Sequence, residues 1–151
     1  MLTPIAILRQ SRVNFLNLIK DYDTATLNRI PQGFSNNLIW NFGHLLVTQQ
    51  LLAYKLSNLP MHYPDAFIDR FRKGTAPQEP VSAQEVEWMK EWALKSVDQM
   101  ESDLAAGLFK EYTPYPTSFG ISLNSIEDAL AFINTHEGLH LGYAMALRKN
   151  L

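Results

Sequence analysis

Apolar residues recur at helical spacing in four long stretches of the chain, and none of them shows the alternation of a strand. In the first stretch, Ile5, Leu8 and Phe15 are separated by three and seven positions, which places them on one face of a helix. Pro4, just before them, suits a first helical turn. The pattern predicts helices over about residues 4–28, 36–58, 82–106 and 125–149.

Turn-forming and capping residues divide these stretches. Pro31 and Gly33 break the chain before the second helix, and Ser82 with Glu85 three residues later forms a capping box at the start of the third. Residues 59–81 contain four prolines and allow at most a short helix. We therefore predict a long, partly ordered crossover between the second and third helices.

These elements indicate an all-α fold, a four-helix bundle. Each helix would be roughly 35 Å long at about 1.5 Å per residue. A chain of 151 residues has the length of one ordinary domain, and such a domain buries roughly 70% of its unfolded surface. We predict a single domain over residues 1–151.

The composition excludes several classes of protein. Apolar residues make up 46% of the chain and charged residues 19%, a balance typical of a globular domain. The 13 Lys and Arg against 15 Asp and Glu give a net charge of −2 without a basic cluster, so nucleic acid is not expected as a partner. Because the chain has no cysteine, a metal ion would have only nitrogen and oxygen ligands.

The sequence gives no sign of export or of a membrane-spanning helix. Arg9 interrupts the apolar run at the N-terminus, which is too short for the core of a signal peptide. No other apolar run approaches the roughly 20 residues needed to cross a bilayer. We expect a cytoplasmic protein with no membrane partner.

Three of the four histidines lie on predicted helices at positions that suit a metal site. His136 and His140 are one turn apart on one face, and His44 lies in the middle of the second helix on its apolar stripe. Each could instead be a hydrogen-bonded core histidine, but an unpaired buried polar group costs about 1–3 kcal/mol. We predict a metal site formed by these three side chains. His62, in the proline-rich crossover, is expected at the surface or the rim.

Imidazole ligands suit several first-row divalent ions, of which we expect one zinc or nickel ion. Three such ligands leave a coordination position open, and an ion with an open position lowers the pKa of a bound thiol or water. Asn41 and Tyr143, one turn from predicted ligands, are weak candidates for contacts to the site or the substrate. For both residues, a purely structural role in packing is an equally good interpretation.

Residues 136–140 read His-Glu-Gly-Leu-His and match the pattern of zinc peptidases, in which the glutamate is the general base. Those enzymes usually take a third ligand downstream and bind peptides at a sheet edge, whereas only 11 residues follow His140 and no strand is predicted. A peptidase is therefore the less favoured alternative. Glu137, a weak catalytic candidate, points about 100° away from His136 on a helix. Its other interpretation is a carboxylate at the edge of the bundle.

Two pairs of residues four positions apart have mainly structural interpretations. Gly138 and Gly142 either bring the fourth helix close to a neighbour or make room at the site, and we favour close packing. Trp88 and Trp92 lie beside the apolar stripe of the third helix and are expected in the core. If both tryptophans were exposed, they would instead form a dimer face.

Two motifs point to a known family. The second helix contains Asn37-Leu38-Ile39-Trp40-Asn41-Phe42-Gly43-His44-Leu45, and the fourth contains His136-Glu137-Gly138-Leu139-His140-Leu141-Gly142-Tyr143. With these motifs the chain resembles the DinB-like (YfiT-like) metalloproteins over essentially its whole length. The resemblance implies an up-down-down-up bundle, commonly dimeric, with a metal site at His44, His136 and His140. It also implies thiol chemistry, because several members are metal-dependent S-transferases or isomerases that use bacillithiol, mycothiol or glutathione.

We therefore expect a homodimeric, metal-dependent transferase or hydrolase that acts on a small-molecule substrate, with a low-molecular-weight thiol as the candidate cosubstrate. The rival hypothesis is a non-catalytic metal-binding module that works through a dimer face. The loop over residues 107–124 carries Tyr112, Tyr115 and Phe119, and we expect it to fold over one end of the bundle. A pocket between this loop and the crossover would suit a small, partly apolar acceptor.

Overall fold

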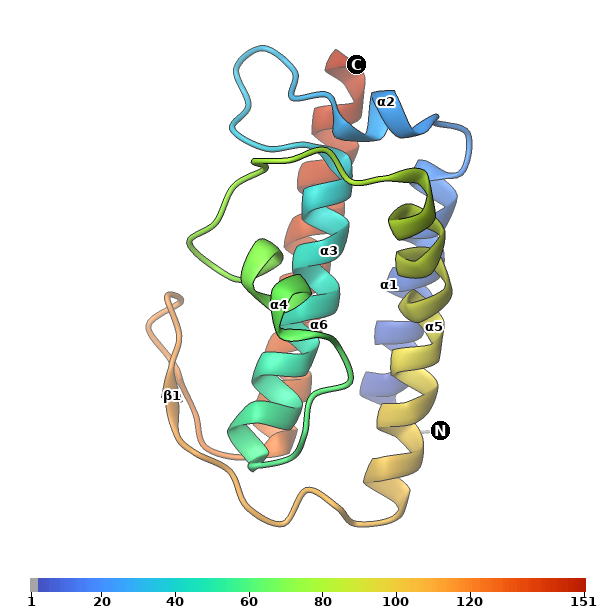
Figure 1. The fold of residues 1–151 in the computed structure, drawn as a ribbon. Coiled ribbons are helices and arrows are strands. Elements are labelled where there is room, and N and C mark those ends of the chain that lie inside the picture. Colours follow the sequence, from blue (N-terminus) through green and yellow to red (C-terminus); the bar gives the residue numbers. More distant parts are fainter. Residues whose placement is uncertain (1–2) are drawn as a thin grey trace.

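The computed structural model of the protein describes residues 3–151. Four long helices within this range form the bundle: α1 (Thr3–Ile19), α3 (Leu38–Gln49), α5 (Ala83–Ala105) and α6 (Ile126–Leu147) (Figure 1). Helix α1 contacts α5 and α6, and α3 contacts the same two helices. In Figure 1, α1 and α6 ascend while α3 and α5 descend. The prediction of an all-α bundle is confirmed.

The N-terminal region differs from the predicted single helix over residues 4–28. Helix α1 ends at Ile19, and a separate short helix, α2 (Thr24–Asn28), follows. The side chain of Asp23 accepts a hydrogen bond of 2.8 Å from the backbone N–H of Thr26 and caps the start of α2. The single-helix prediction was wrong because this N-cap lies inside a stretch whose apolar residues keep their helical spacing.

The second predicted helix has the expected extent but an irregular end. The side chain of Asn37 accepts a hydrogen bond of 2.8 Å from the N–H of Trp40 and caps the start of α3. The helix then continues as a π-helical segment, η1 (Gln50–Tyr54), and a 3₁₀ turn, η2 (Lys55–Ser57). Such π segments occur frequently at functional sites.

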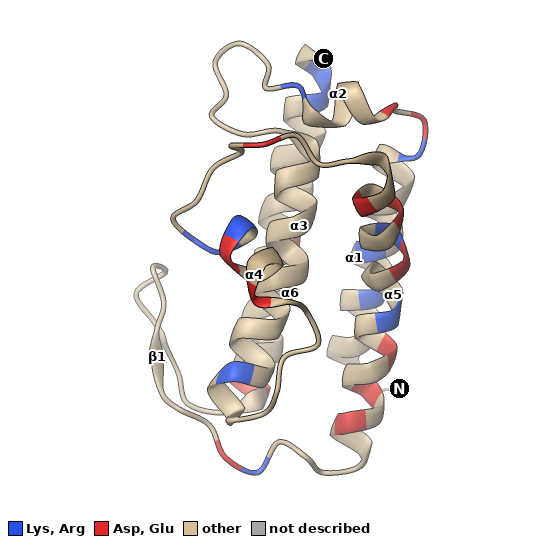
Figure 2. Ribbon diagram, viewed as in Figure 1, with Lys and Arg blue, Asp and Glu red and all other residues tan. Residues whose placement is uncertain are grey.

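Helix α3 is the centre of the fold, because all of its residues from Leu38 to Gln49 are buried. Besides α5 and α6, it contacts α2 and α4 (Asp65–Phe71), the short helix of the crossover. The crossover therefore covers α3 as well as connecting two helices. A helix covered on all sides has no polar face, and α3 carries no charged residue. Charged residues are concentrated on α5 instead, as the blue and red segments of its ribbon show (Figure 2).

Two short strands, β1 (Tyr115–Pro116) and β2 (Ser122–Leu123), pair antiparallel in the loop between α5 and α6. The loop crosses the lower end of the bundle in Figure 1, and β2 contacts α6. No strand was predicted, because strands of two residues are too short to show alternation. After α6, the chain ends with the 3₁₀ turn η3 (Arg148–Asn150).

The remaining sequence patterns on α5 behave as predicted. Ser82 and Glu85 form the capping box at its start. Trp88 and Trp92 are partly buried, and their rings pack edge-on against Tyr63 at centroid distances of 5.4 and 5.3 Å. The two tryptophans therefore belong to an aromatic part of the core and do not form an exposed patch.

None of the helices in residues 3–151 has the length and hydropathy needed to span a membrane.

An ion pair lies inside the core. The side chain of Arg12 on α1 is fully buried, and that of Glu137 on α6 is only 1% exposed. The Nε atom of Arg12 donates to Oε1 and Oε2 of Glu137 at 2.8 and 2.9 Å, and Nη2 lies 2.6 Å from Oε1 in the ion pair. The interpretation of Glu137 as a carboxylate at the bundle edge was therefore wrong.

Arg12 also reaches the other helices of the bundle. Its Nη2 donates to the backbone carbonyl of Leu45 at 3.1 Å and to Oε1 of Gln49 at 3.3 Å, both on α3. Gln49 donates from Nε2 to the carbonyl of Ser96 on α5 at 3.0 Å and accepts a bond from the Ser96 hydroxyl at 3.0 Å. One guanidinium thus connects α1 directly to α6 and α3, and through Gln49 to α5.

Replacing Arg12 by methionine is expected to destabilise the protein by about 3–5 kcal/mol, because the buried carboxylate of Glu137 loses its counter-charge. Urea unfolding at pH 7, followed by circular dichroism, measures the change. The double variant Arg12→Met with Glu137→Met removes both charges and should recover a good part of the loss. If the double variant is no more stable than Arg12→Met, the ion pair is not the source of the loss.

Candidate metal centre

Three imidazoles meet between α3 and α6. His44 comes from α3, and His136 and His140 come from adjacent turns of α6. The Nε2 atoms of His44 and His136 are 3.2 Å apart, and one nitrogen from each of the three rings lies within 4.8 Å of the others. The structure therefore brings together the three histidines singled out from the sequence.

The backbone of Phe71 fixes the tautomer of His44. Nδ1 of His44 lies 2.7 Å from the carbonyl oxygen of Phe71, the last residue of α4. Because a carbonyl can only accept, Nδ1 carries the proton and donates it, and Nε2 presents a lone pair. The indole of Trp40 stacks on the imidazole with a centroid distance of 4.9 Å and an angle of 9°, which further holds the plane of the ring.

Asn41 fixes the tautomer of His140 in the same way. The amide Nδ2 of Asn41 donates to Oδ1 of Asn36 at 2.8 Å and to the carbonyl of Asn37 at 2.7 Å. Its Oδ1 is therefore left as an acceptor, and it lies 2.8 Å from Nδ1 of His140. His140 thus donates from Nδ1 and presents its Nε2 lone pair. Asn41, a weak candidate from the sequence, contacts a predicted ligand directly.

The three imidazole nitrogens suit a divalent transition-metal ion as ligands. Two nitrogens bound to zinc at about 2.0–2.1 Å are about 3.3 Å apart in a tetrahedral site. The 3.2 Å between His44 and His136 matches that spacing. Metal-bound histidines usually donate a hydrogen bond from their other ring nitrogen to a carbonyl or carboxylate oxygen. His44 donates such a bond from Nδ1 to the carbonyl oxygen of Phe71.

Burial keeps the three imidazoles neutral, which is the form that binds a metal. Loss of hydration lowers the pKa of His136 to about 3, helped by the nearby His140, His44 and Arg12. Burial, with a smaller contribution from His44, lowers the pKa of His140 to about 4. Burial also lowers the pKa of His44, although its hydrogen bond to Phe71 acts in the opposite direction.

Gly43 allows α4 to approach α3 at the site. A Cβ atom on Gly43 would lie only 2.5 Å from Cδ1 of the Phe71 ring, so a larger residue forces the ring to move. The backbone carbonyl of the same Phe71 holds His44. The sequence motif contained Gly43 without a reason for it, and its reason is a contact with a residue 28 positions further along the chain.

The three histidines form part of the wall of a cavity of about 490 Å³, a size typical of small-molecule sites. Tyr115 and Phe119 from the hairpin loop and Lys73 from the crossover also line it. The cavity therefore lies between that loop and the crossover, where the sequence suggested a pocket. Tyr112 does not line the cavity. Its hydroxyl donates to the backbone carbonyl of Leu52 at 3.0 Å.

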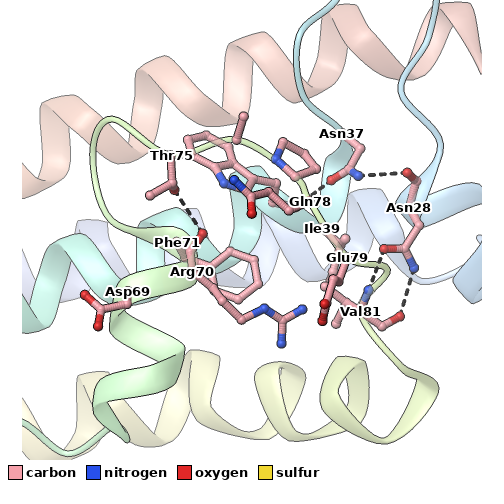
Figure 3. A pocket seen from close by; sticks show the side chains of 13 residues that line it. Asn28, Asn37, Ile39, Asp69, Arg70, Phe71, Thr75, Gln78, Glu79 and Val81 are labelled. Atoms are coloured by element: carbon pink, nitrogen blue, oxygen red, sulfur yellow. Dashed lines mark hydrogen bonds between the residues drawn. The ribbon is translucent and has the colours of Figure 1, made fainter.

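A second, smaller cavity of about 230 Å³ lies between α4 and the residues that follow it in the crossover (Figure 3). Asn28 donates to the carbonyl of Val81 at 2.9 Å and accepts from its N–H at 2.8 Å. Asn37 donates to the carbonyl of Asn28 at 2.8 Å. These polar groups bind one another and fix the crossover against α2 and α3, so we interpret this cavity as structural.

The other candidates from the sequence lie away from the histidine cavity. The carboxylate of Glu137 is bound to Arg12, and Glu137 does not line the cavity. Tyr143 is 37% exposed, and its ring packs edge-on against Phe34 at 5.6 Å. His62 is partly buried at the rim of the core, with its ring edge-on to Tyr54 at 4.6 Å. His62 is not part of the histidine cluster.

Gly138 and Gly142 are not packing glycines within this chain. Both are exposed, and nothing in the described structure lies within 4 Å of a Cβ built at either position. The preference for close packing was therefore wrong, because the open face of α6 at these positions contacts no neighbouring helix of the same chain.

Comparison with known proteins identifies a family. A family model described as the DinB superfamily matches residues 7–144. The matched region contains all three histidines together with Asn41, Gly43 and Phe71. No curated protein shows a significant match to the chain.

The substitution Gly43→Ala is expected to weaken zinc binding about tenfold or more, because it displaces Phe71 and with it the acceptor for His44. Competition with a chromophoric zinc chelator measures the affinity. Gly138→Ala is the matched control: its Cβ meets nothing within 4 Å, so zinc affinity should be unchanged. Equal zinc affinities in the two variants would show that Gly43 has no role in orienting the site.

The metal-free protein is expected to lose stability as the pH falls below about 6.5. In the unfolded chain a histidine has a pKa of about 6.5, whereas burial lowers the pKa of folded His136 to about 3. The unfolded state therefore binds protons that the folded state excludes, and stability falls as the pH drops from about 6.5 towards 3. Thermal unfolding at a series of pH values measures this. His136→Gln should show a shallower decrease between pH 6.5 and 4.5, and an identical decrease would contradict the buried neutral imidazole.

Proposed function

This chain belongs to the DinB superfamily, and on that premise we propose that it is an enzyme that binds one divalent metal ion through His44, His136 and His140. The proposal rests on the convergence of three neutral imidazoles on the wall of a cavity of about 490 Å³. Structural zinc sites are almost always closed by four protein ligands, whereas three ligands leave a position open to a substrate. Zinc and nickel are the ions we expect.

We infer that the reaction is a group transfer or a hydrolysis on a small molecule. When bound, the ion supplies the Lewis acidity that lowers the pKa of a thiol or a water molecule. The carbonyl of Phe71 and the amide of Asn41 hold two of the imidazoles by their Nδ1 protons. Thr48, whose hydroxyl is 3.5 Å from Nε2 of His44, lines the same cavity and can bond to a substrate atom beside the ligands.

The nucleophile in this proposal is a low-molecular-weight thiol or a water molecule. The thiol follows from the resemblance to metal-dependent S-transferases, and the chain has no cysteine of its own to serve instead. Apolar side chains around the histidines, among them Leu51, Phe132 and Leu139, limit the water that competes with a thiol.

A second proposal, a non-catalytic module that works as a homodimer, is favoured by the outer face of α6. Met145 on α6 is 48% exposed, and Ile7 on the neighbouring α1 is 50% exposed. Exposed apolar side chains of this kind are typical of contact faces. A dimer is also compatible with catalysis, so the two proposals differ only in what the metal does.

Peptidase activity has less support. Glu137 would have to act as the general base, but its carboxylate binds Arg12 in the core and it does not line the cavity. A base must reach the proton that it removes, directly or through one water molecule.

Purified protein is expected to contain about one equivalent of zinc or nickel per chain. Elemental analysis should find little metal in His44→Ala and His140→Ala, since each substitution removes one of three ligands. His62→Ala is the matched control, a histidine outside the cluster, and should keep the full equivalent. Full occupancy in His44→Ala, or no metal in wild-type protein after reconstitution, would refute the site.

Removal of the metal ion distinguishes the proposed enzyme from the proposed non-catalytic metal-binding module. A catalytic site should lose thiol-transfer or hydrolytic turnover on chelation while the melting temperature falls only slightly. An ion that serves the fold should instead lower the melting temperature strongly when removed.

A further inference from the structure

Two lysines line the histidine cavity without partners of their own. Lys55 belongs to η2 at the end of the α3 segment, and Lys73 belongs to the crossover just after α4. Both side chains are exposed, and neither has an ion-pair partner in the part of the chain that the structure describes. By contrast, Lys90 and Lys95 on α5 pair with Glu87 and Glu91.

The charge of this cavity is opposite to that of the protein as a whole. The chain has a net charge of −2, yet among the described residues the cavity is lined by two lysines and by no Asp or Glu. The side-chain charges of Lys, Arg, Asp and Glu on the described wall are thus both positive, and they attract an anion.

Most of the remaining side chains of the wall are apolar. The aliphatic part of the wall comes from η1, η2 and α6, and the aromatic part comes from the hairpin loop and α6. The apolar side chains are Leu51, Leu52, Leu56, Leu139, Phe119 and Phe132. Lys55 follows His44 by 11 positions of nearly continuous helix, roughly 16 Å at about 1.5 Å per residue. Lys73 lies at another part of the wall, two positions after Phe71, whose carbonyl oxygen binds His44.

We propose that the ligand of this cavity is an organic acid with an apolar body, whose anionic group is attracted by the ammonium groups of Lys55 and Lys73. The apolar body lies against the leucine and phenylalanine side chains, on the same wall as the histidines. As an assignment of the substrate class the inference rests on the proposed function, although the binding of the acid itself does not require the metal.

The test compares an acid with its uncharged analogue. Isothermal titration calorimetry at pH 7.5 measures the binding of 4-phenylbutyrate and of 4-phenylbutan-1-ol, which share the apolar body and differ in charge. Each is titrated into zinc-loaded protein and into protein stripped with a chelator, with circular dichroism to check that the helices persist. The stripped protein isolates the lysines, because a carboxylate can also bind directly to zinc.

The acid is expected to bind at least about fivefold more tightly than the alcohol in both forms of the protein. In the double variant Lys55→Gln with Lys73→Gln, the stripped protein should bind acid and alcohol within about twofold of each other. The matched control, Lys20→Gln with Lys149→Gln, changes the net charge equally at exposed positions outside the cavity and should keep the preference. Raising the salt concentration should reduce the preference in wild-type protein.

Two results would overturn the inference: equal binding of acid and alcohol by stripped wild-type protein, or an undiminished preference in the Lys55 and Lys73 double variant. Phe119→Ala should weaken both compounds by a similar factor, because it removes apolar wall without changing charge. The metal content of the double variant should stay at about one equivalent, since the lysines are not ligands. A protein that binds the acid through the lysines but holds no metal would refute the proposed function and leave the acid site standing.

Discussion

The buried guanidinium of Arg12 is the group on which the arrangement of the bundle depends. It binds Glu137, which follows His136 in α6, and the carbonyl of Leu45, which follows His44 in α3. The two helices that supply the histidines are therefore tied to one rigid planar group, next to the residues that converge. Breaking a buried ion pair is strongly unfavourable. The pair therefore opposes any shift of α6 along α3 next to His44 and His136.

Around this constraint the orientation of two imidazoles, those of His44 and His140, is set by groups that belong to the fold. The carbonyl of Phe71 is available because Gly43 lets α4 approach α3, and Asn41 is fixed as an acceptor by its own two hydrogen bonds. These contacts place Nε2 lone pairs of His44 and His140 towards the same region before any ligand arrives, and such pre-organisation is what a metal site with an open position requires. The cavity of about 490 Å³ then gives that position access to a small molecule.

The sequence predicted what depends on spacing and local chemistry: the long helices, the proline-rich crossover, and the three histidines as a group. It did not predict what depends on distant partners. The partner of Arg12 is 125 positions away, and the only local signal was a charged residue on the apolar face that Leu8 and Phe15 define. The break after Ile19 was missed because helical spacing continues across it, and the hairpin was missed because its strands are two residues long. The role of Gly43 follows only from the position of Phe71.

The most direct test of this account is X-ray absorption spectroscopy at the metal edge of the zinc-loaded protein, because it reports the ligands of the ion itself. The expected spectrum contains about three imidazole nitrogens at about 2.0–2.1 Å, with the multiple scattering that imidazole rings produce, and at least one further light atom at the open position. A shell of oxygen atoms without imidazole scattering would mean that the ion binds elsewhere, and that His44, His136 and His140 are core residues held by hydrogen bonds alone.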